Sequence, residues 1–435
     1  MLRIEDTDKE RSAEQYVQAL QNDLLWMGLP WQEGPGIEGT QGPYAQSERS
    51  SIYHEYFVSL GRYGHAYPCF CSEAELALAR KSQLSAGQAP RYLGTCAKLS
   101  DTEIRARLAQ GLRPTLRFRV PRGRAVVFDD LVRGPQTFTS DDIGDFIIRR
   151  ADGSPAFFFS NALDDALMGV THVLRGEDHL SNTPRQLMLL EAWALTAPQY
   201  GHVSLILGAD NTPLSKRHGS HSVRELREAG YFPEAINNYM ARLGHTYENN
   251  DFMDTDALAR GFNLQKIGRS PAHFDGAQLQ HWQQQAIAQA DHDWLWQWMG
   301  AEVQKLVPQD QASAFVTAVR ANVQTPKDAW DWADRVYSQS IGNTEEATTS
   351  ITTVGPEFFE KAKSQLDPMM DFAVFLAKVK MVTGKQGKSL FLPLRSALTG
   401  ETSGPELPKI FPLIGLSLAS HRLDAARQLS EASQR

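Results

Sequence analysis

The spacing of apolar side chains predicts a mixed α/β fold at the front of the chain and helices at the back. Residues 13–27 and 48–63 place apolar side chains at helical intervals. From about residue 290 onward the helical spacing continues through DWLWQWMG, AWDWADRVYSQ and MMDFAVFLAKVKMVTG. We expect the tryptophans of these segments mostly to fill the core or pack helices together, with base stacking as the alternative.

The chain opens with a short apolar run, Leu2 to Ile4, which its composition predicts as a strand. Thr7 or Asp8 can cap the helix that follows, because each offers a side-chain oxygen to unpaired backbone N–H groups. A strand at this position normally pairs with neighbours earlier in the chain. We therefore expect this stretch to belong to the middle of a domain.

An arginine-rich region follows the second predicted helix. Residues 115–120, TLRFRV, alternate in character, which predicts a half-buried strand with Arg117 and Arg119 on one face and apolar side chains on the other. Residues 105–150 contain ten Arg, no Lys, five Asp and no Glu, a balance of 10 − 5 = +5 within a chain of net charge −7. A solvated strand face is one interpretation. The other is an insertion that binds a polyanion, since Arg suits phosphate oxygens.

Polar side chains gather where a short apolar strand ends. Within residues 162–190 the pattern predicts helix, strand and helix around THVLRGEDHLSNTPRQ. The predicted strand at Val173 and Leu174 leads into Arg175, Glu177, Asp178 and His179. In parallel α/β sheets this carboxyl edge is where ligands bind. The alternative is an ordinary polar loop with an internal ion pair.

A second polar segment, DNTPLSKRHGS at residues 210–220, is flanked by Gly and Pro. Its cations could converge with backbone N–H groups on a phosphate, and a loop of this kind can close as charge develops in the transition state. Most basic loops are simply solvated. The position of this one, after RGEDH in an α/β chain with a helical tail, favours the phosphate role.

Length and composition restrict the class of protein. A chain of 435 residues suggests about three structural units. No run approaches the ~18 apolar residues of a membrane span, so we expect no membrane association. Three cysteines cannot form a disulfide framework, which favours the reducing cytoplasm.

Five ordered motifs carry a family resemblance. LRIEDTD, GPYAQSER, NALDDALMGVTHVLRGEDHLSNTPRQ, PLSKRHGS and KSLFLPLRSALTG together closely resemble bacterial glutamyl-tRNA synthetases, which are class I aminoacyl-tRNA synthetases. LSKRHG looks like the second class I signature, although Pro213 stands where the signature usually begins with Lys.

The resemblance implies an architecture from one end of the chain to the other. A Rossmann-type α/β catalytic domain, lacking its first strand and helix, is split by an α+β insertion that binds the acceptor stem. A stem-contact domain with the LSKRHG loop and an all-α anticodon-binding region follow. The implied boundaries are 1–66 and 146–195 for the catalytic domain, 67–145 for the insertion, 196–292 for the stem-contact domain and 293–435 for the anticodon-binding region.

The implied activity is that of a glutamate–tRNA ligase. ATP with Mg²⁺ activates L-glutamate to glutamyl-adenylate, and the glutamyl group passes to the 3′ end of tRNA. The sequence leaves open whether the acceptor is tRNA(Glu) alone or tRNA(Gln) as well. A carboxylate needs no general base to attack phosphorus, so positioning and charge neutralisation carry the first step. The resemblance further implies a monomer.

The resemblance also assigns residues. Glu5 holds the ammonium group of glutamate, Asn161 and Arg175 hold its carboxylates, and Phe157 lines the site where many relatives carry Tyr, so one substrate hydrogen bond is in doubt. We expect Lys216, with Ser215 and Arg217, to act on the ATP phosphates. The expected ATP site also includes Leu214, Gly176, Glu177 and Asp178. A further hypothesis has Glu177 and Asp178 orient Arg175.

The three cysteines resemble the zinc knob of the family's acceptor-binding insertion. Cys69 and Cys71 are followed by Cys96, and many relatives end this motif in Cys-x-His, where this chain has Lys98. Tyr92 matches the spacing of the shorter paralogue, glutamyl-queuosine-tRNA(Asp) synthetase. Three thiolates and a phenolate could hold one zinc ion. The alternative is three buried thiols that act as small apolar residues.

Two other functions stay open. The shorter paralogue is one, although it lacks a large C-terminal helical region. A truncated, noncatalytic tRNA-binding relic is the other, because no HIGH-like sequence occurs in residues 1–435, whereas family members carry one before RIEDTD. An internal start codon or a decayed gene could explain this, and we favour the first. We therefore expect the chain as numbered to be a poor adenylating enzyme.

Overall fold

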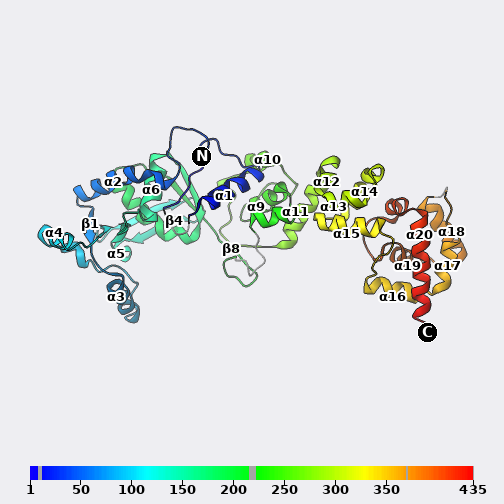
Figure 1. Ribbon diagram of the computed structural model, residues 1–435. Helices are drawn as coiled ribbons and strands as arrows, with labels where there is room; N and C mark the ends of the chain where they lie inside the picture. The colour runs from blue at the N-terminus through cyan, green and yellow to red at the C-terminus, as the bar shows by residue number, and fades with distance from the viewer. Residues whose placement is uncertain (8–11, 215–221, 369–370, 435) are drawn as a thin grey trace. The chain divides into compact units, whose positions relative to one another are not determined.

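The computed structural model describes residues 1–7, 12–214, 222–368 and 371–434 (Figure 1). The chain forms two compact units. The first unit comprises Met1–Ser220, Ala241–Asn250 and Thr255–Phe274, and the second comprises His221–Met240, Asp251–Asp254 and Asp275–Arg435. Each unit is considered by itself below.

The front of the first unit departs from the predicted strand. Ile4 forms only an isolated parallel bridge with Ala45, held by hydrogen bonds from the Ile4 N–H to the Tyr44 carbonyl (2.8 Å) and from the Gln46 N–H to the Ile4 carbonyl (2.9 Å). Helix α1 (Glu14–Trp26) begins after Ala13, so the prediction that Thr7 caps it is wrong, and Asp8 lies outside the described residues. The predicted helices are confirmed as α1 and α2 (Ser50–Arg62).

An antiparallel sheet with strand order β1 (Ala66–Cys69), β2 (Thr115–Phe118), β5 (Phe146–Arg149) follows. The hairpin β3 (Ala125–Asp130) and β4 (Gly134–Thr139) and the helices α3 (Glu73–Ser85), α4 (Asp101–Ala109) and α5 (Ser140–Ile143) complete this region. β2 confirms the predicted strand. The first of the two interpretations, a solvated strand face, does not hold for Arg117, because this residue is buried, its guanidinium lies 3.8 Å from the Tyr92 ring centroid and it donates to the Asp145 carbonyl.

Helix, strand and helix at residues 157–192 are confirmed as α6 (Phe157–Leu167), β6 (His172–Gly176) and α7 (Thr183–Ala192). β6 pairs in parallel with β7 (Gln199–Val203), and the register places Arg175 opposite His202. The core beside this pair includes Phe159, Leu163 and Leu189, all fully buried. Each such side chain contributes about 1.5–3 kcal/mol on burial, so this core fixes α6 and α7 against each other.

The last elements of the first unit are short. They are β8 (Ile206–Leu207), which pairs in parallel with β9 (Ala272–His273), and α10 (Thr255–Gly261).

The second unit is helical over its described residues, which confirms the helical pattern predicted from about residue 290 onward. Its helices are α8 (Val223–Glu228), α9 (Pro233–Arg242, whose last two residues belong to the first unit), α11 (Gly276–Gln289), α12 (His292–Trp298), α13 (Ala301–Leu306), α14 (Ala312–Val319), α15 (Pro326–Tyr337), α16 (Glu345–Val354), α17 (Pro356–Lys363), α18 (Phe372–Thr383), α19 (Lys388–Thr399) and α20 (Leu407–Ala432). Trp294 and Trp298 both pack edge-on against Phe232, which supports the helix-packing interpretation of these tryptophans.

A buried arginine ties three helices of the second unit together. Arg422 of α20 donates to the Leu398 carbonyl (2.6 Å) in α19 and to the Val336 (3.2 Å) and Ser338 (2.7 Å) carbonyls at the end of α15. Burial lowers the pKa of Arg422 to about 10. The partial negative charge at the two helix C-termini stabilises this cation in place of a carboxylate.

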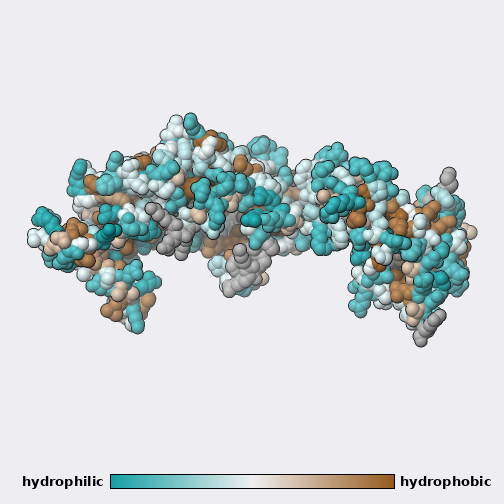
Figure 2. All heavy atoms as spheres, viewed as in Figure 1, coloured by the Kyte–Doolittle hydropathy of each residue, from teal (hydrophilic) through white to brown (hydrophobic). Residues whose placement is uncertain are grey.

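The visible surface is mostly hydrophilic, with hydrophobic residues in small separate patches (Figure 2). Scattered apolar side chains of this kind are normal on folded proteins. Among the described residues, none of the helices combines the length and the apolar composition that a membrane crossing requires.

Candidate functional site

The polar residues after β6 lie at the carboxyl end of a parallel strand pair, as predicted. Arg175 is the fourth residue of β6, and Gly176 ends the strand before the 3₁₀ segment Glu177–Asn182. A Cβ at Gly176 would lie 2.5 Å from Asp178 Oδ1 and 3.3 Å from Leu205 Cδ2, so a larger residue here would require the Asp178 side chain to move. In open α/β sheets this edge is the usual ligand site.

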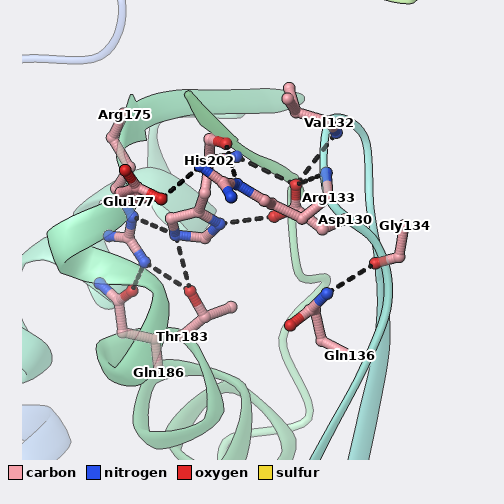
Figure 3. A network of polar contacts seen from close by, with 10 residues as sticks. All are labelled: Asp130, Val132, Arg133, Gly134, Gln136, Arg175, Glu177, Thr183, Gln186 and His202. Atoms are coloured by element: carbon pink, nitrogen blue, oxygen red, sulfur yellow. Dashed lines mark hydrogen bonds and ion pairs between the residues drawn. The ribbon is translucent and has the colours of Figure 1, made fainter. Parts of the chain in front are cut away.

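The guanidinium of Arg175 is held rigidly by three side chains (Figure 3). Its Nε donates to His202 Nε2 (3.1 Å), and its Nη2 donates to Thr183 Oγ1 (2.8 Å) and Gln186 Oε1 (2.6 Å). Burial lowers the pKa of Arg175, and among the described residues no carboxylate lies within ion-pair distance of it. The remaining nitrogen, Nη1, is buried and has no hydrogen-bond partner. A buried cationic donor without a partner is costly, and an anionic ligand would complete it.

Hydrogen bonds connect Arg175 to other predicted glutamate-binding residues. Gln186 Nε2 lies 3.5 Å from Asn161 Oδ1, and Asn161 Nδ2 donates to Glu5 Oε1 (2.5 Å). The structure therefore brings Glu5, Asn161 and Arg175 into one network. Phe157 lies one turn before Asn161 on α6, and its ring is 5.3 Å from that of His179.

Arg3 contacts Glu5 through an ion pair. Its Nη2 forms ion pairs with Glu5 (3.1 Å) and with the buried carboxylate of Asp165 (2.7 Å). Burial by itself would lower the pKa of Arg3, but Asp165 and Glu5 outweigh this and raise it. Arg3 is thus shared between two carboxylates, so Glu5 has only part of one cation as its partner at this place and can accept a second cation.

The hypothesis that Glu177 and Asp178 orient Arg175 is wrong. Glu177 forms an ion pair with Arg133 from the β3–β4 turn and accepts a hydrogen bond from the Leu205 N–H (3.3 Å). Asp178 lies 3.7 Å from His179. The turn at Gly176 directs both carboxylates toward other partners.

The basic segment expected to act on ATP comes after β8 in the sequence. Ser215, Lys216 and Arg217 lie outside the described residues. Leu214, the residue before them, donates its N–H to the Ile206 carbonyl (2.9 Å). The assignments of this loop to catalysis and ATP binding stay predictions.

The predicted zinc ligands converge at the end of β1. The sulfur atoms of Cys69, Cys71 and Cys96 lie within 4.8 Å of one another, and those of Cys71 and Cys96 are 3.6 Å apart. Tyr92 Oη is 3.4 Å from the sulfur atoms of both Cys69 and Cys71, and it accepts a hydrogen bond from the Cys96 N–H (2.9 Å). Two zinc-bound thiolates at 2.3 Å are about 3.8 Å apart in a tetrahedral site, so these positions fit the donor set of zinc.

The surroundings of Cys69 and Cys71 shift the pKa values of these two thiols in opposite directions. Burial by itself would raise the pKa of Cys69, but hydrogen bonds with Tyr92 and Arg117 lower it to about 7. Burial raises the pKa of Cys71 to about 11, against the effect of Tyr92. The protein side chains therefore favour the thiolate at Cys69 more than at Cys71.

The first unit also contains a cavity of about 730 Å³ that the sequence did not indicate. Asp6, Thr7, the start of α2 and the turn at 149–155 line it, and its wall includes His54 and Arg150. Gln46 and Tyr53, which also line it, both donate to Asp164, so this wall is anchored to α6.

Sequence reasoning missed the residues that support the predicted ones. Arg3, Thr183, Gln186 and His202 all belong to the networks above, and Asp130 joins them through a contact with His202 Nδ1 (2.5 Å). Thr183 and Gln186 lie on the same face of α7, which was a usable signal. Asp130 and His202 are 72 positions apart, and no local pattern relates them.

Comparisons with known proteins agree with this geometry. Residues 1–281 match the family model of tRNA synthetases class I (E and Q), catalytic domain, and residues 278–427 match an anticodon binding domain. Glutamate–tRNA ligase 2 of Nitrosococcus oceani is 56% identical to this chain, in an alignment that covers 97% of this chain and 90% of that protein. Glutamate–tRNA ligase 2 of Alkalilimnicola ehrlichii is 51% identical, in an alignment that covers 99% of this chain and 91% of that protein.

Solved structures agree as well. The glutamate–tRNA synthetase of Elizabethkingia anophelis matches with a TM-score of 0.85 at 25% identity, over 98% of this chain and 92% of that one. A glutamate–tRNA ligase of Elizabethkingia meningosepticum, solved in complex with its amino acid, matches with a TM-score of 0.83 at 26% identity and the same coverage. The predicted fold class, a Rossmann-type catalytic domain followed by a helical anticodon-binding region, is confirmed. The chain belongs to the family of class I tRNA synthetases of the E and Q type.

Proposed function

We infer that this protein is a glutamate–tRNA ligase, which activates glutamate with ATP and transfers it to tRNA. Curated relatives of that function match nearly the whole chain. The observation that carries the inference is the buried, unpartnered Nη1 of Arg175. It lies in a network that also holds a carboxylate, Glu5. A zwitterionic amino acid with a second carboxylate complements such a site.

The network suggests how glutamate binds. Arg175 Nη1 donates to a carboxylate oxygen of the substrate, and the amide of Asn161 supplies a second polar contact. Glu5 accepts from the ammonium group, while Arg3 is also paired with Asp165. Phe157 offers no hydroxyl, so binding relies on these charged contacts.

Activation then needs positioning more than proton transfer. A carboxylate oxygen of glutamate bonds to the α-phosphorus of ATP as the bond to pyrophosphate breaks. Lys216, with Ser215 and Arg217, neutralises the phosphate oxygens on which negative charge grows. Leu214 and the Gly176–Asp178 turn are the proposed neighbours of ATP, whose phosphates carry the Mg²⁺.

The tRNA is bound through both units. In the first unit, Arg105, Arg113, Arg119, Arg122 and Arg124 are exposed in the insertion. These cations suit the phosphates of the acceptor stem, and the anticodon binding domain supplies the second contact. We propose tRNA(Glu) as the substrate, with tRNA(Gln) as an additional one, and a monomeric, cytoplasmic enzyme.

We further propose that Cys69, Cys71, Cys96 and Tyr92 hold one structural zinc ion. Three sulfur atoms and a phenol oxygen gathered in one place support this proposal more strongly than three independent buried thiols would. The ion would fix β1 against the segment around Cys96 and so hold the shape of the insertion.

Glutamylation assays test the proposed function. The 435-residue protein, which we expect to form the adenylate slowly because residues 1–435 contain no HIGH-like sequence, should still attach L-glutamate to tRNA(Glu) in an ATP-dependent reaction and leave L-glutamine and L-aspartate unused. Transfer to tRNA(Gln) in the same assay decides the second acceptor. Binding of tRNA without any glutamylation would instead support the noncatalytic relic, and transfer to tRNA(Asp) alone would support the shorter paralogue's activity.

A further inference from the structure

A buried histidine–aspartate pair lies behind Arg175 and is not explained by substrate contact. His202 and Asp130 are both completely buried, and His202 Nδ1 lies 2.5 Å from Asp130 Oδ2. The opposite side of the imidazole, Nε2, faces Arg175 Nε at 3.1 Å (Figure 3).

The donors around this ring determine where its proton lies. Arg175 Nε can only donate, so His202 Nε2 must accept. The proton of the neutral ring is therefore on Nδ1, which donates to Asp130. Burial lowers the pKa of His202 against the effect of Asp130, which keeps the ring in this neutral state.

Asp130 is itself fixed so that only one oxygen faces the ring. Its Oδ1 accepts from the backbone N–H groups of Val132 (3.0 Å), Arg133 (2.8 Å) and His202 (3.1 Å). The β3–β4 turn that presents Asp130 is joined to β7 by the hydrogen bond from the Leu131 N–H to the Tyr200 carbonyl (2.8 Å). Oδ2 is thus held in place as an acceptor for His202.

We propose that Asp130 and His202 are positioning residues for substrate binding: Asp130 fixes the tautomer of His202, and His202 then holds Arg175 so that Nη1 faces the glutamate carboxylate. This rests on the proposed role of Arg175 in binding glutamate. A hydrogen bond from Nε to His202, together with those from Nη2 to Thr183 and Gln186, fixes the plane of the guanidinium and leaves one nitrogen for the ligand.

Three substitutions separate this role from general support of the fold. In Asp130→Asn, the oxygen must stay with the three backbone N–H groups, so the amide NH₂ faces His202 and forces its proton to Nε2, against Arg175. His202→Asn keeps a donor toward Asp130 and loses the acceptor for Arg175. His202→Gln keeps an acceptor for Arg175, since its side-chain oxygen can reach the position of Nε2, and loses the donor toward Asp130. Asp129→Asn, an exposed neighbour on the same strand, is the matched control.

The readout is the dissociation constant for L-glutamate, measured by titration calorimetry, with thermal unfolding to confirm folding. We expect binding to weaken about 10- to 100-fold in Asp130→Asn and His202→Asn, the scale for losing a partner that orients a binding group. His202→Gln should weaken it less than about fivefold, since the hydrogen bond to Arg175 survives, and Asp129→Asn should bind as the wild type does.

Two results would overturn the positioning role. One is wild-type affinity in His202→Asn. The other is an equal loss in His202→Gln and His202→Asn, which would mean that the pair only supports the fold. Arg175→Gln distinguishes this failure from that of the proposed function. If it too binds glutamate normally, Arg175 is not the carboxylate ligand.

Discussion

Replacing Asp164 by Asn should destabilise the first unit strongly, because Asp164 is the fully buried acceptor of an ionic network. Its carboxylate accepts hydrogen bonds from Arg49 Nε (2.7 Å), Gln46 Nε2 (2.9 Å) and Tyr53 Oη (2.7 Å). The Arg49 and Asp164 side chains are 2% and 0% exposed. Asp164→Asn removes the negative charge and turns an NH₂ group toward donors that need acceptors.

The expected magnitude follows from this burial. Removing one partner of a buried ion pair costs about 3–5 kcal/mol, because the other charge stays buried without compensation. Among the described residues, the asparagine oxygen and the Pro43 carbonyl, 3.0 Å from Arg49 Nη1, would be the acceptors left to that guanidinium, and neither carries a negative charge. We therefore expect the free energy of local unfolding to fall by about 4 kcal/mol in α2 and α6, the helices that the network joins.

Hydrogen exchange measured by mass spectrometry is the suitable assay, because it reports unfolding of peptides from α2 and α6 without assuming that the whole chain unfolds in one step. Glu228→Gln is the control. It breaks the Arg224–Glu228 pair, which has a similar separation of 2.8 Å but is 68% and 59% exposed, so the change should stay below about 0.5 kcal/mol. The double variant Arg49→Met/Asp164→Leu should recover most of the loss, since no buried charge is left. An Asp164→Asn protein within about 1 kcal/mol of wild type would refute the reasoning.

Three further predictions follow from the proposed chemistry. Lys216→Ala should lower the rate of adenylation by about 10²- to 10³-fold, measured as pyrophosphate exchange, with little change in tRNA binding. A near-normal rate would remove this loop from the mechanism. Protein purified without added zinc should contain about one equivalent of zinc, lost in Cys71→Ala, whereas metal-free wild-type protein with an intact insertion would contradict the site. Burial lowers the pKa of His202, so the unfolded chain takes up a proton first as the pH falls below about 6.5, and the free energy of unfolding should fall with it. His202→Gln should reduce this pH dependence in urea unfolding between pH 7.5 and 5.5, and an unchanged slope would show that another group causes it.

Local periodicity was enough to predict some of the elements of this chain, although not the strand expected at Leu2 to Ile4. α1, α2 and β2 follow from apolar side chains spaced at helical or alternating intervals. The glutamate-binding residues Glu5, Asn161 and Arg175 were predicted from motifs, and the structure joins them in one network. Such predictions succeed where a segment of a few residues carries its own signal.

The failures share a different cause, which is contact between distant segments. Arg117 has the alternating position of a surface residue, but Tyr92 packs over it and buries it. Glu177 lies two positions after Arg175 in the sequence, yet it forms its ion pair with Arg133 from a separate hairpin. The pairing of Asp130 with His202 depends on how the β3–β4 turn meets β7, which no single segment specifies.

The most direct test of the central claim is the crystal structure of this protein with L-glutamate bound. We expect a glutamate carboxylate oxygen about 2.7–2.9 Å from Arg175 Nη1, the distance of a charge-assisted hydrogen bond, and the ammonium group beside Glu5. The contacts of Arg175 with His202, Thr183 and Gln186 should be unchanged. Glutamate bound elsewhere, with Nη1 still unpartnered, would contradict the account.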